Sequence, residues 1–146
     1  MLVSITKPAL DLPWVRSTAN LSEFEAIRFL RPSETEDGIE RHFGVNHLAH
    51  FLLTSLLMQS LVAGSGPRHK SRVVYVSSAC HLLCPVNFDD PAWRLSDDEN
   101  RPLLDYAQSK TANILMAKYI NDFCGPRGVH AFAVDRGLYT VPIFAG

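Results

Sequence analysis

The chain lacks the features that mark membrane-spanning, secreted and nucleic-acid-binding proteins. No continuous apolar run reaches about 18 residues, so we expect no membrane span, and the first residues contain no apolar stretch typical of a secretion signal. The formal net charge of −1 gives no electrostatic reason to bind nucleic acid or an anionic surface. The three cysteines, Cys80, Cys84 and Cys124, are an odd number without paired spacing, which favours reduced thiols and a cytoplasmic location.

Glycine also lacks the arrangement that binds a dinucleotide. The only Gly-x-Gly among the eight glycines is Gly64-Ser65-Gly66, which follows a predicted helix and precedes a predicted strand. A phosphate-binding loop needs the reverse order, because the backbone N–H groups at a helix N-terminus must point at the ligand. We therefore expect residues 64–70 to form an ordinary connecting loop.

Composition and pattern predict a single folded unit of the α/β class. The 146 residues are 47% hydrophobic and 20% charged, which is typical of one globular domain. Apolar periods, caps and glycine–proline stops predict a short strand at 2–6, a helix from Asp37 to Leu61 or Val62, a strand at 72–77, a helix from Pro102 or Leu103 to about Cys124, and a strand at 129–134. Strand, helix, strand in this order predicts a parallel pair, and residues 1–34 are otherwise expected to be irregular.

The first predicted helix carries apolar residues over a broad face. They are Ile39, Phe43, Leu48, Phe51, Leu52, Leu56 and Leu57. A stripe this wide is typical of a helix with most of its surface in a core, so we expect this helix to be largely buried.

Tyr106 and Lys110 form the pattern with the clearest chemical meaning. Side chains four residues apart lie on one face of a helix, so the Lys110 ammonium would lie near the Tyr106 phenol. A nearby positive charge favours the phenolate and lowers the pKa of the phenol from about 10 toward the range of a general acid or base. A solvated helix rich in Tyr and Lys also produces this spacing by chance.

The surrounding segments give the pair a context. A predicted β-branched strand has the sequence Arg72-Val73-Val74-Tyr75-Val76 and ends in Ser77-Ser78. Upstream of it lies the segment Phe43-Gly44-Val45-Asn46-His47-Leu48-Ala49-His50-Phe51. The helix that carries the pair has the sequence Tyr106-Ala107-Gln108-Ser109-Lys110-Thr111-Ala112-Asn113. In wording and order these segments resemble the short-chain dehydrogenase/reductase family, most closely its retinol-dehydrogenase-like and WW-domain-oxidoreductase-like branch. The resemblance covers about residues 35–137. It implies a partial, doubly wound Rossmann-like fold, with 35–146 as the C-terminal half of the family's domain.

The resemblance implies four catalytic residues. Tyr106 would be the general acid in carbonyl reduction and the base in alcohol oxidation, and Lys110 would lower its pKa and hold the ribose of NADP or NAD. Ser78 would bind the substrate oxygen, with Ser77 as the alternative if the strand slips by one residue. Asn46 would hold a water that passes protons to Lys110. The structural alternatives are a simple cap for Ser78 and a satisfied buried amide for Asn46.

The chain departs from the family pattern on both sides of these motifs. The family's Thr-Gly-x-x-x-Gly-x-Gly turn and Asn-Asn-Ala-Gly stretch have no counterpart before Thr35, so we expect a truncated member. After the last strand, Gly137 keeps the glycine that approaches the nicotinamide, Arg136 replaces a proline, and Thr140 lies one residue early. The implied cofactor contacts are therefore Tyr106, Lys110, Asn46, Gly137 and Thr140, with weakened binding.

Two functions from different classes are consistent with these observations. The first is an oxidoreductase that transfers hydride between NADP(H) or NAD(H) and a small-molecule carbonyl or alcohol. The second is a truncated, catalytically silent relative that is an interaction module or a gene remnant. In the family the two long helices often form a dimer interface, so the resemblance implies a homo- or hetero-oligomer through residues 37–62 and 103–123.

Histidine and cysteine do not predict a metal site. Cys80-His81-x-x-Cys84 lacks the second pair of ligands that a structural zinc site needs. The family phrase carries His47 and His50 as packing residues. No partner can be recognised in the sequence for His42, His69 or His130.

Overall fold

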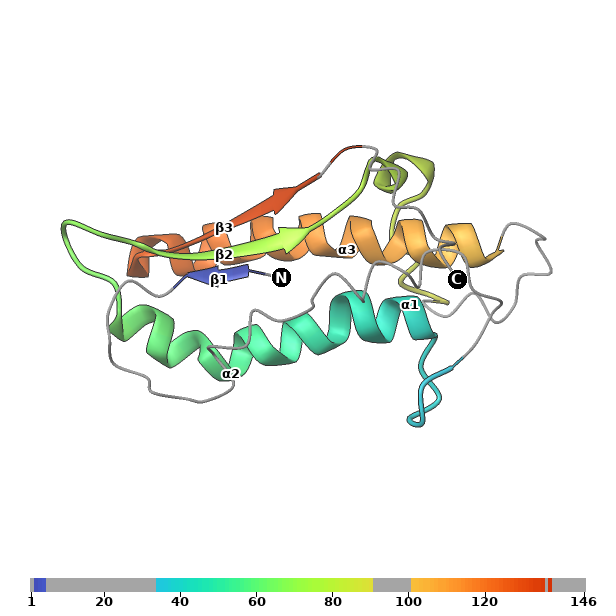
Figure 1. The fold of residues 1–146 in the computed structure, drawn as a ribbon, viewed down its shortest axis with the longest axis horizontal. Coiled ribbons are helices and arrows are strands. Elements are labelled where there is room, and N and C mark those ends of the chain that lie inside the picture. The colour runs from blue at the N-terminus through green and yellow to red at the C-terminus, as the bar shows by residue number, and fades with distance from the viewer. Residues whose placement is uncertain (1, 5–33, 91–100, 136, 138–146) are drawn as a thin grey trace, which may run out of the picture.

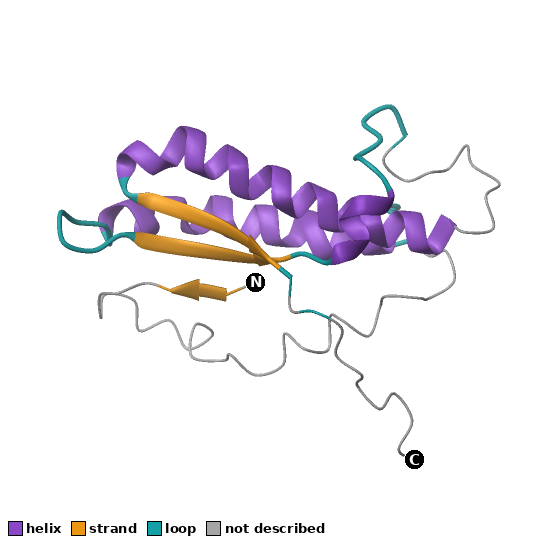
Figure 2. Cartoon of the chain, turned by 90° about the horizontal axis from the view of Figure 1, so that it is seen from above, coloured by secondary structure: helices purple, strands orange, loops and turns teal. Residues whose placement is uncertain are grey.

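The fold is a small sheet with its long helices packed on one face (Figures 1 and 2). The computed structural model describes residues 2–4, 34–90, 101–135 and 137. Within them, β2 (Ser71–Val76) and β3 (Val129–Val134) pair in parallel, and β1 (Leu2–Ser4) pairs antiparallel with the other edge of β2. The parallel pair and the α/β, Rossmann-like class are therefore confirmed.

A long helix runs from Arg41 to Ala63 and begins later than predicted. It consists of α1 (Arg41–Phe43), the π-helical η2 (Gly44–Leu48) and α2 (Ala49–Ala63). Asp37 is not its cap, because residues 35–38 form a turn in which the Gly38 N–H donates to the Thr35 carbonyl at 3.0 Å. Glu40 caps the helix instead: its carboxylate accepts the N–H groups of His42 and Phe43, each at 2.7 Å. A carboxylate here also interacts favourably with the helix dipole.

A second long helix, α3 (Arg101–Cys124), connects β2 to β3. It begins one residue before Pro102, a position where a proline costs no hydrogen bond because first-turn N–H groups have no helical acceptor. The predicted stop is confirmed: η4 (Gly125–Arg127) follows, and Gly128 adopts a left-handed φ of 89°. The short 3-10 helix η3 (Ala79–Leu83), directly after β2, was not predicted.

The core lies between the sheet and the two long helices. Alternate residues of the strands face the helices, among them Val73, Tyr75 and Ala131, and pack against Leu57, Leu61, Met116, Ala117 and Ile120. The buried Tyr75 hydroxyl lies 2.8 Å from Thr54 Oγ1, so its polar atom is satisfied inside the core. This packing fixes β2 against both helices and so positions the residues at its carboxyl end.

The first long helix is not largely buried, and that prediction was wrong. Phe51, Leu52 and Leu56 are 43%, 58% and 72% exposed, whereas the residues that α2 buries are Thr54, Leu57 and Leu61. The helix turns this partly polar stripe toward the sheet, where Leu57 and Leu61 pack in the core and Thr54 bonds to Tyr75. Much of its apolar surface therefore remains on the outside of the described part of the chain.

The same helix, Arg41–Ala63, is long and apolar enough to cross a membrane by length and composition alone. No span was expected from the sequence. Mostly buried core helices pass the same test, whereas only 22% of the apolar window of this helix is buried in the described structure.

Candidate functional site

Tyr106 and Lys110 lie on the buried face of α3, near the carboxyl end of β2. Tyr106 is 6% exposed and Lys110 is 5% exposed, and Lys110 Nζ lies 5.3 Å from the centroid of the Tyr106 ring. A cation at this distance is attracted to the ring and favours the phenolate. The pair is therefore not a solvated helix face, although its catalytic role stays a prediction.

The Lys110 amine is held by a backbone carbonyl. Nζ donates to the carbonyl oxygen of Val76, the last residue of β2, at 3.1 Å. Burial lowers the pKa of Lys110 from 10.5 to about 8, and the nearby Cys80 side chain partly opposes this shift. The amine thus changes charge close to neutral pH, which is common for groups at functional sites.

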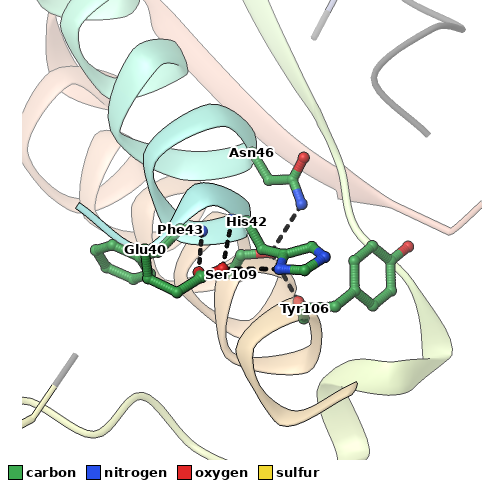
Figure 3. A network of polar contacts seen from close by, with 6 residues as sticks. All are labelled: Glu40, His42, Phe43, Asn46, Tyr106 and Ser109. Atoms are coloured by element: carbon green, nitrogen blue, oxygen red, sulfur yellow. Dashed lines mark hydrogen bonds and ion pairs between the residues drawn. The ribbon is translucent and has the colours of Figure 1, made fainter. Parts of the chain in front are cut away.

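Asn46 reaches this region from η2. Its side chain is buried, and Nδ2 donates at 3.1 Å to Ser109 Oγ, which in turn donates to the Tyr106 carbonyl at 2.7 Å (Figure 3). π-Helical segments are frequent at functional sites, where they redirect backbone groups. Asn46 is thus a buried residue whose amide N–H group is hydrogen-bonded beside the Tyr106 turn. Its water-mediated contact with Lys110 stays a prediction.

Asn113 links the two long helices to β2, a role that was not predicted. Its Nδ2 donates to the carbonyls of Asn46 and Val76 at 3.1 and 3.2 Å, so Asn113 and Lys110 share the Val76 acceptor. Its Oδ1 lies 3.1 Å from His47 Nδ1. The sequence held a signal for this role, because a residue three positions after Lys110 lies on the same face of the helix.

Ser77 and Ser78 leave β2 with their hydroxyls in different environments. Ser77 is buried and donates to the Lys110 carbonyl at 3.0 Å, so its hydroxyl holds α3 against the strand. Ser78 caps η3, where its Oγ accepts the Cys80 N–H at 3.3 Å. The capping alternative for Ser78 is therefore observed. A cap uses only an acceptor lone pair, so the Ser78 O–H can still donate to a substrate oxygen.

Two histidines adjoin Asn46 and Asn113. His50 Nδ1 lies 2.8 Å from the Asn46 carbonyl oxygen, and burial lowers the pKa of His50 to about 4. Burial also lowers the pKa of His47, and its hydrogen bond with Asn113 partly opposes this effect. Both rings are therefore neutral at pH 7 and contribute hydrogen bonds rather than charge.

His42, which had no recognisable partner in the sequence, pairs with Glu40 in the interior. Their Nδ1 and Oε1 atoms are 2.8 Å apart and both residues are 1% exposed. The His42 ring meets the Tyr106 ring edge-on, with centroids 6.2 Å apart and an interplanar angle of 79° (Figure 3). The buried Asp105 completes a cluster whose ligand atoms lie within 4.8 Å of one another. Both Glu40 oxygens accept backbone N–H groups, so the Glu40 carboxylate of this cluster caps the first long helix.

The residues predicted to contact the nicotinamide are described only in part. Gly137 follows β3 with a φ of 74°, and its N–H donates to the Asp135 carboxylate at 2.9 Å. Among the described residues, an added Cβ on Gly137 would meet nothing within 4 Å. Arg136 and Thr140 lie outside the described residues. Gly64-Ser65-Gly66 lies between α2 and β2, in the loop order expected from the sequence.

Comparisons with known proteins extend these observations. No family model matches the chain. The chain is 40% identical to human retinol dehydrogenase 13 over 104 residues, which are 71% of this chain and 30% of that protein. It is 38% identical over 105 residues to a short-chain dehydrogenase/reductase of Penicillium roqueforti, covering 72% of this chain and 30% of the relative. The crystal structure of an uncharacterized protein from Mycobacterium paratuberculosis superposes with a TM-score of 0.62 and 34% identity, over 78% of this chain and 40% of that one.

The likeness thus extends to both sequence and fold, although the chain spans only 30% of the length of each of these two curated relatives. The chain belongs to the short-chain dehydrogenase/reductase family of oxidoreductases.

Proposed function

We propose that this chain carries the proton-transfer groups of a carbonyl/alcohol oxidoreductase that uses NADP or NAD. The observation that supports this most is the buried pair itself, with Lys110 Nζ 5.3 Å from the Tyr106 ring centroid. In reduction, the Tyr106 hydroxyl would donate its proton to the carbonyl oxygen while hydride adds to the carbon. In oxidation it would accept the alcohol proton.

The charge of Lys110 is close enough to decide whether Tyr106 can act in this way. The distance that gives the scale is the 5.3 Å from Lys110 Nζ to the Tyr106 ring centroid. At an effective dielectric constant of about 20, unit charges at a separation of this order interact by about 3 kcal/mol, or about two pKa units, while Lys110 is protonated. Burial of the phenol opposes its ionisation, because desolvation favours the neutral form. The nearby ammonium is therefore what would bring the phenol into a useful pKa range.

Ser78 and Asn46 would complete the proton-transfer site. Ser78 follows β2, and ligands of open α/β sheets bind outside the carboxyl ends of the strands, so its O–H would bind the substrate oxygen beside Tyr106. Asn46 would act through Ser109, which it holds at 3.1 Å and which bonds to the Tyr106 carbonyl. The Tyr106 turn is thereby fixed relative to the first long helix.

The donor groups fit the ribose end of a nicotinamide dinucleotide. Lys110 has three N–H donors and uses one on Val76, so it and the Tyr106 hydroxyl would hold the ribose hydroxyls. When bound, NADP or NAD supplies the hydride. Gly137 and Thr140 would meet the nicotinamide. The sequence contains no glycine loop for the pyrophosphate, and each missing charge-assisted hydrogen bond costs about 1.5–3 kcal/mol, so we expect weak binding.

A second candidate function is an interaction module, favoured by an apolar groove between α2 and α3. The groove has a volume of about 360 Å³, and its lining includes Phe51, Phe88, Leu115 and Tyr119. These four side chains are 43–78% exposed, and exposed aromatic patches of this kind are common at protein interfaces. We propose that these helix faces form a homo- or hetero-oligomer.

Two measurements on the same protein, of turnover and of oligomeric state, separate the two functions. NADPH or NADH oxidation is measured with a panel of aldehydes and ketones, and oligomeric state is measured by sedimentation. The first function predicts turnover that Tyr106→Phe reduces by at least about 100-fold, while Tyr119→Phe, on the exposed side of the same helix, retains it. Turnover that survives in Tyr106→Phe would remove Tyr106 from the mechanism. An oligomer without any turnover would favour the interaction module.

A further inference from the structure

Two side chains contact the Tyr106 ring from different parts of the chain. Lys110 Nζ lies 5.3 Å from the ring centroid, and the His42 ring meets it edge-on at 6.2 Å. Lys110 belongs to the same helix as Tyr106, whereas His42 comes from the start of the first long helix, 64 positions earlier in the sequence. The phenol is therefore held from outside its own helix as well as from within it.

Glu40 fixes the position of His42 through both its backbone and its ring. The carboxylate oxygen Oε1 accepts the His42 backbone N–H at 2.7 Å and lies 2.8 Å from Nδ1, while Oε2 accepts the Phe43 N–H at 2.7 Å. One buried carboxylate thus caps the helix and sets the orientation of the His42 ring (Figure 3). The same carboxylate therefore holds the imidazole beside the Tyr106 ring.

We propose that Glu40 and His42 are positioning residues that hold the Tyr106 phenol close to Lys110. This inference deepens the proposed function and rests on it for its catalytic meaning. An edge-on ring contact restrains a phenol without reacting with it. If the restraint were lost and the ring moved about 1.5 Å away from Lys110, Coulomb's law at a dielectric constant of about 20 predicts that the phenol pKa would rise by about half a unit.

Several charged and titratable groups belong to the elements packed around Tyr106 or interact with Lys110 or with the Glu40–His42 pair, and the test must separate their charge from the position of the ring. They are Asp105 and Lys110 on α3, Glu40 and His42 at the start of the first long helix, and Cys80 and Cys84 on and after η3. Replacement of Glu40 would remove a charge as well as a restraint. Replacement of His42 leaves the carboxylates of Glu40 and Asp105 in place, so it is the cleaner perturbation.

The experiment is a pH titration of the Tyr106 phenol by NMR in the full chain labelled with [13Cζ]tyrosine. The Tyr106 signal is the one that disappears in Tyr106→Phe. We expect His42→Ala to raise the phenol pKa by about half a unit or more. His42→Phe keeps an aromatic edge against the ring and should restore most of the original value. His69→Ala, a change on the exposed loop before β2, should have no effect.

A double-mutant comparison shows whether the effect acts through Lys110. In a Lys110→Met background, His42→Ala should shift the phenol pKa by much less than it does alone, because the charge that it positions is gone. An unchanged phenol pKa in a folded His42→Ala chain would overturn the proposal, as would an equal shift in the Lys110→Met background. If His42→Ala does not fold, His42→Leu fills the volume without an aromatic edge and is judged by the same two outcomes. The titration needs no cofactor or substrate, so its failure would leave the proposed oxidoreductase function standing.

Discussion

Replacement of Lys110 by methionine should stabilise the protein at neutral pH. Burial lowers the pKa of Lys110 from 10.5 to about 8 in the folded chain, so below about pH 8 the folded state holds a charged amine in an unfavourable place. The shift of about 2.5 units corresponds to about 3 kcal/mol. The variant loses the hydrogen bond to Val76, worth about 1 kcal/mol, but that carbonyl keeps the Asn113 Nδ2 at 3.2 Å. The expected net gain at pH 7 is about 2 kcal/mol.

The sign of the pH dependence follows from proton binding. Between about pH 8 and 10.5 the unfolded chain keeps a lysine proton that the folded chain has released, so the wild type gains stability as pH rises. Lys110→Met has no such gain, and its advantage should shrink and then reverse. Urea unfolding at about pH 7 and about pH 9.5 measures both values. Lys118→Met, at a side chain that is 71% exposed on the same helix, is the matched control. A destabilised Lys110→Met at pH 7, or a difference that does not change with pH, would refute the burial argument.

Three further predictions concern stability and binding. Thr54→Val should lower the free energy of unfolding in urea by about 1–3 kcal/mol, because it leaves the buried Tyr75 hydroxyl without its partner at 2.8 Å. The double variant with Tyr75→Phe should recover part of this loss. If the stability losses of the two single variants simply add in the double variant, the pairing is contradicted. His50, with its pKa lowered from 6.5 to about 4, should make the wild type lose about 3 kcal/mol of stability as pH falls through this window, because the unfolded chain takes up the proton first. His50→Gln should flatten this pH dependence of the unfolding free energy, and equal slopes in the two proteins would place His50 in water. Calorimetric titration with NADPH and NADH should show weak binding or none, whereas a micromolar dissociation constant would show that the missing glycine loop is not needed.

The sequence predicted the parts of the fold that depend on local pattern. The strands at 72–77 and 129–134 were predicted within one residue, because both are short β-branched runs next to turn signals. The end of α3 followed from Gly125-Pro126. The start of the first helix did not, because Asp37 and Glu40 are both acceptable caps and only the Thr35–Gly38 turn decides between them. The prediction that the first long helix is largely buried was also wrong, since the face that α2 turns inward includes Thr54, which contacts Tyr75 of a distant strand.

The site was predictable where its residues share one helix. Tyr106 and Lys110 come together through the four-residue spacing alone. Contacts between distant segments carried no such signal: Asn46 meets Ser109 across 63 positions, and Asn113 meets Asn46 across 67. Glu40 and His42 are close in sequence, but they pair at the start of a helix, where the helical repeat of apolar residues does not indicate which polar side chains are buried. The chemistry of the site was therefore recognisable before the network that holds it.

The central claim is that the Lys110 cation makes the Tyr106 phenol a usable proton donor. The most direct test is the phenol pKa, measured by [13Cζ]tyrosine NMR in the wild type and in Lys110→Met. We predict a value below about 10 in the wild type and a rise in the variant. The rise should be smaller than the full Coulomb shift, because Lys110, with a pKa of about 8, has lost much of its charge where the phenol titrates. A wild-type phenol that titrates at or above its ordinary pKa, or that is indifferent to loss of the lysine charge, would contradict the account.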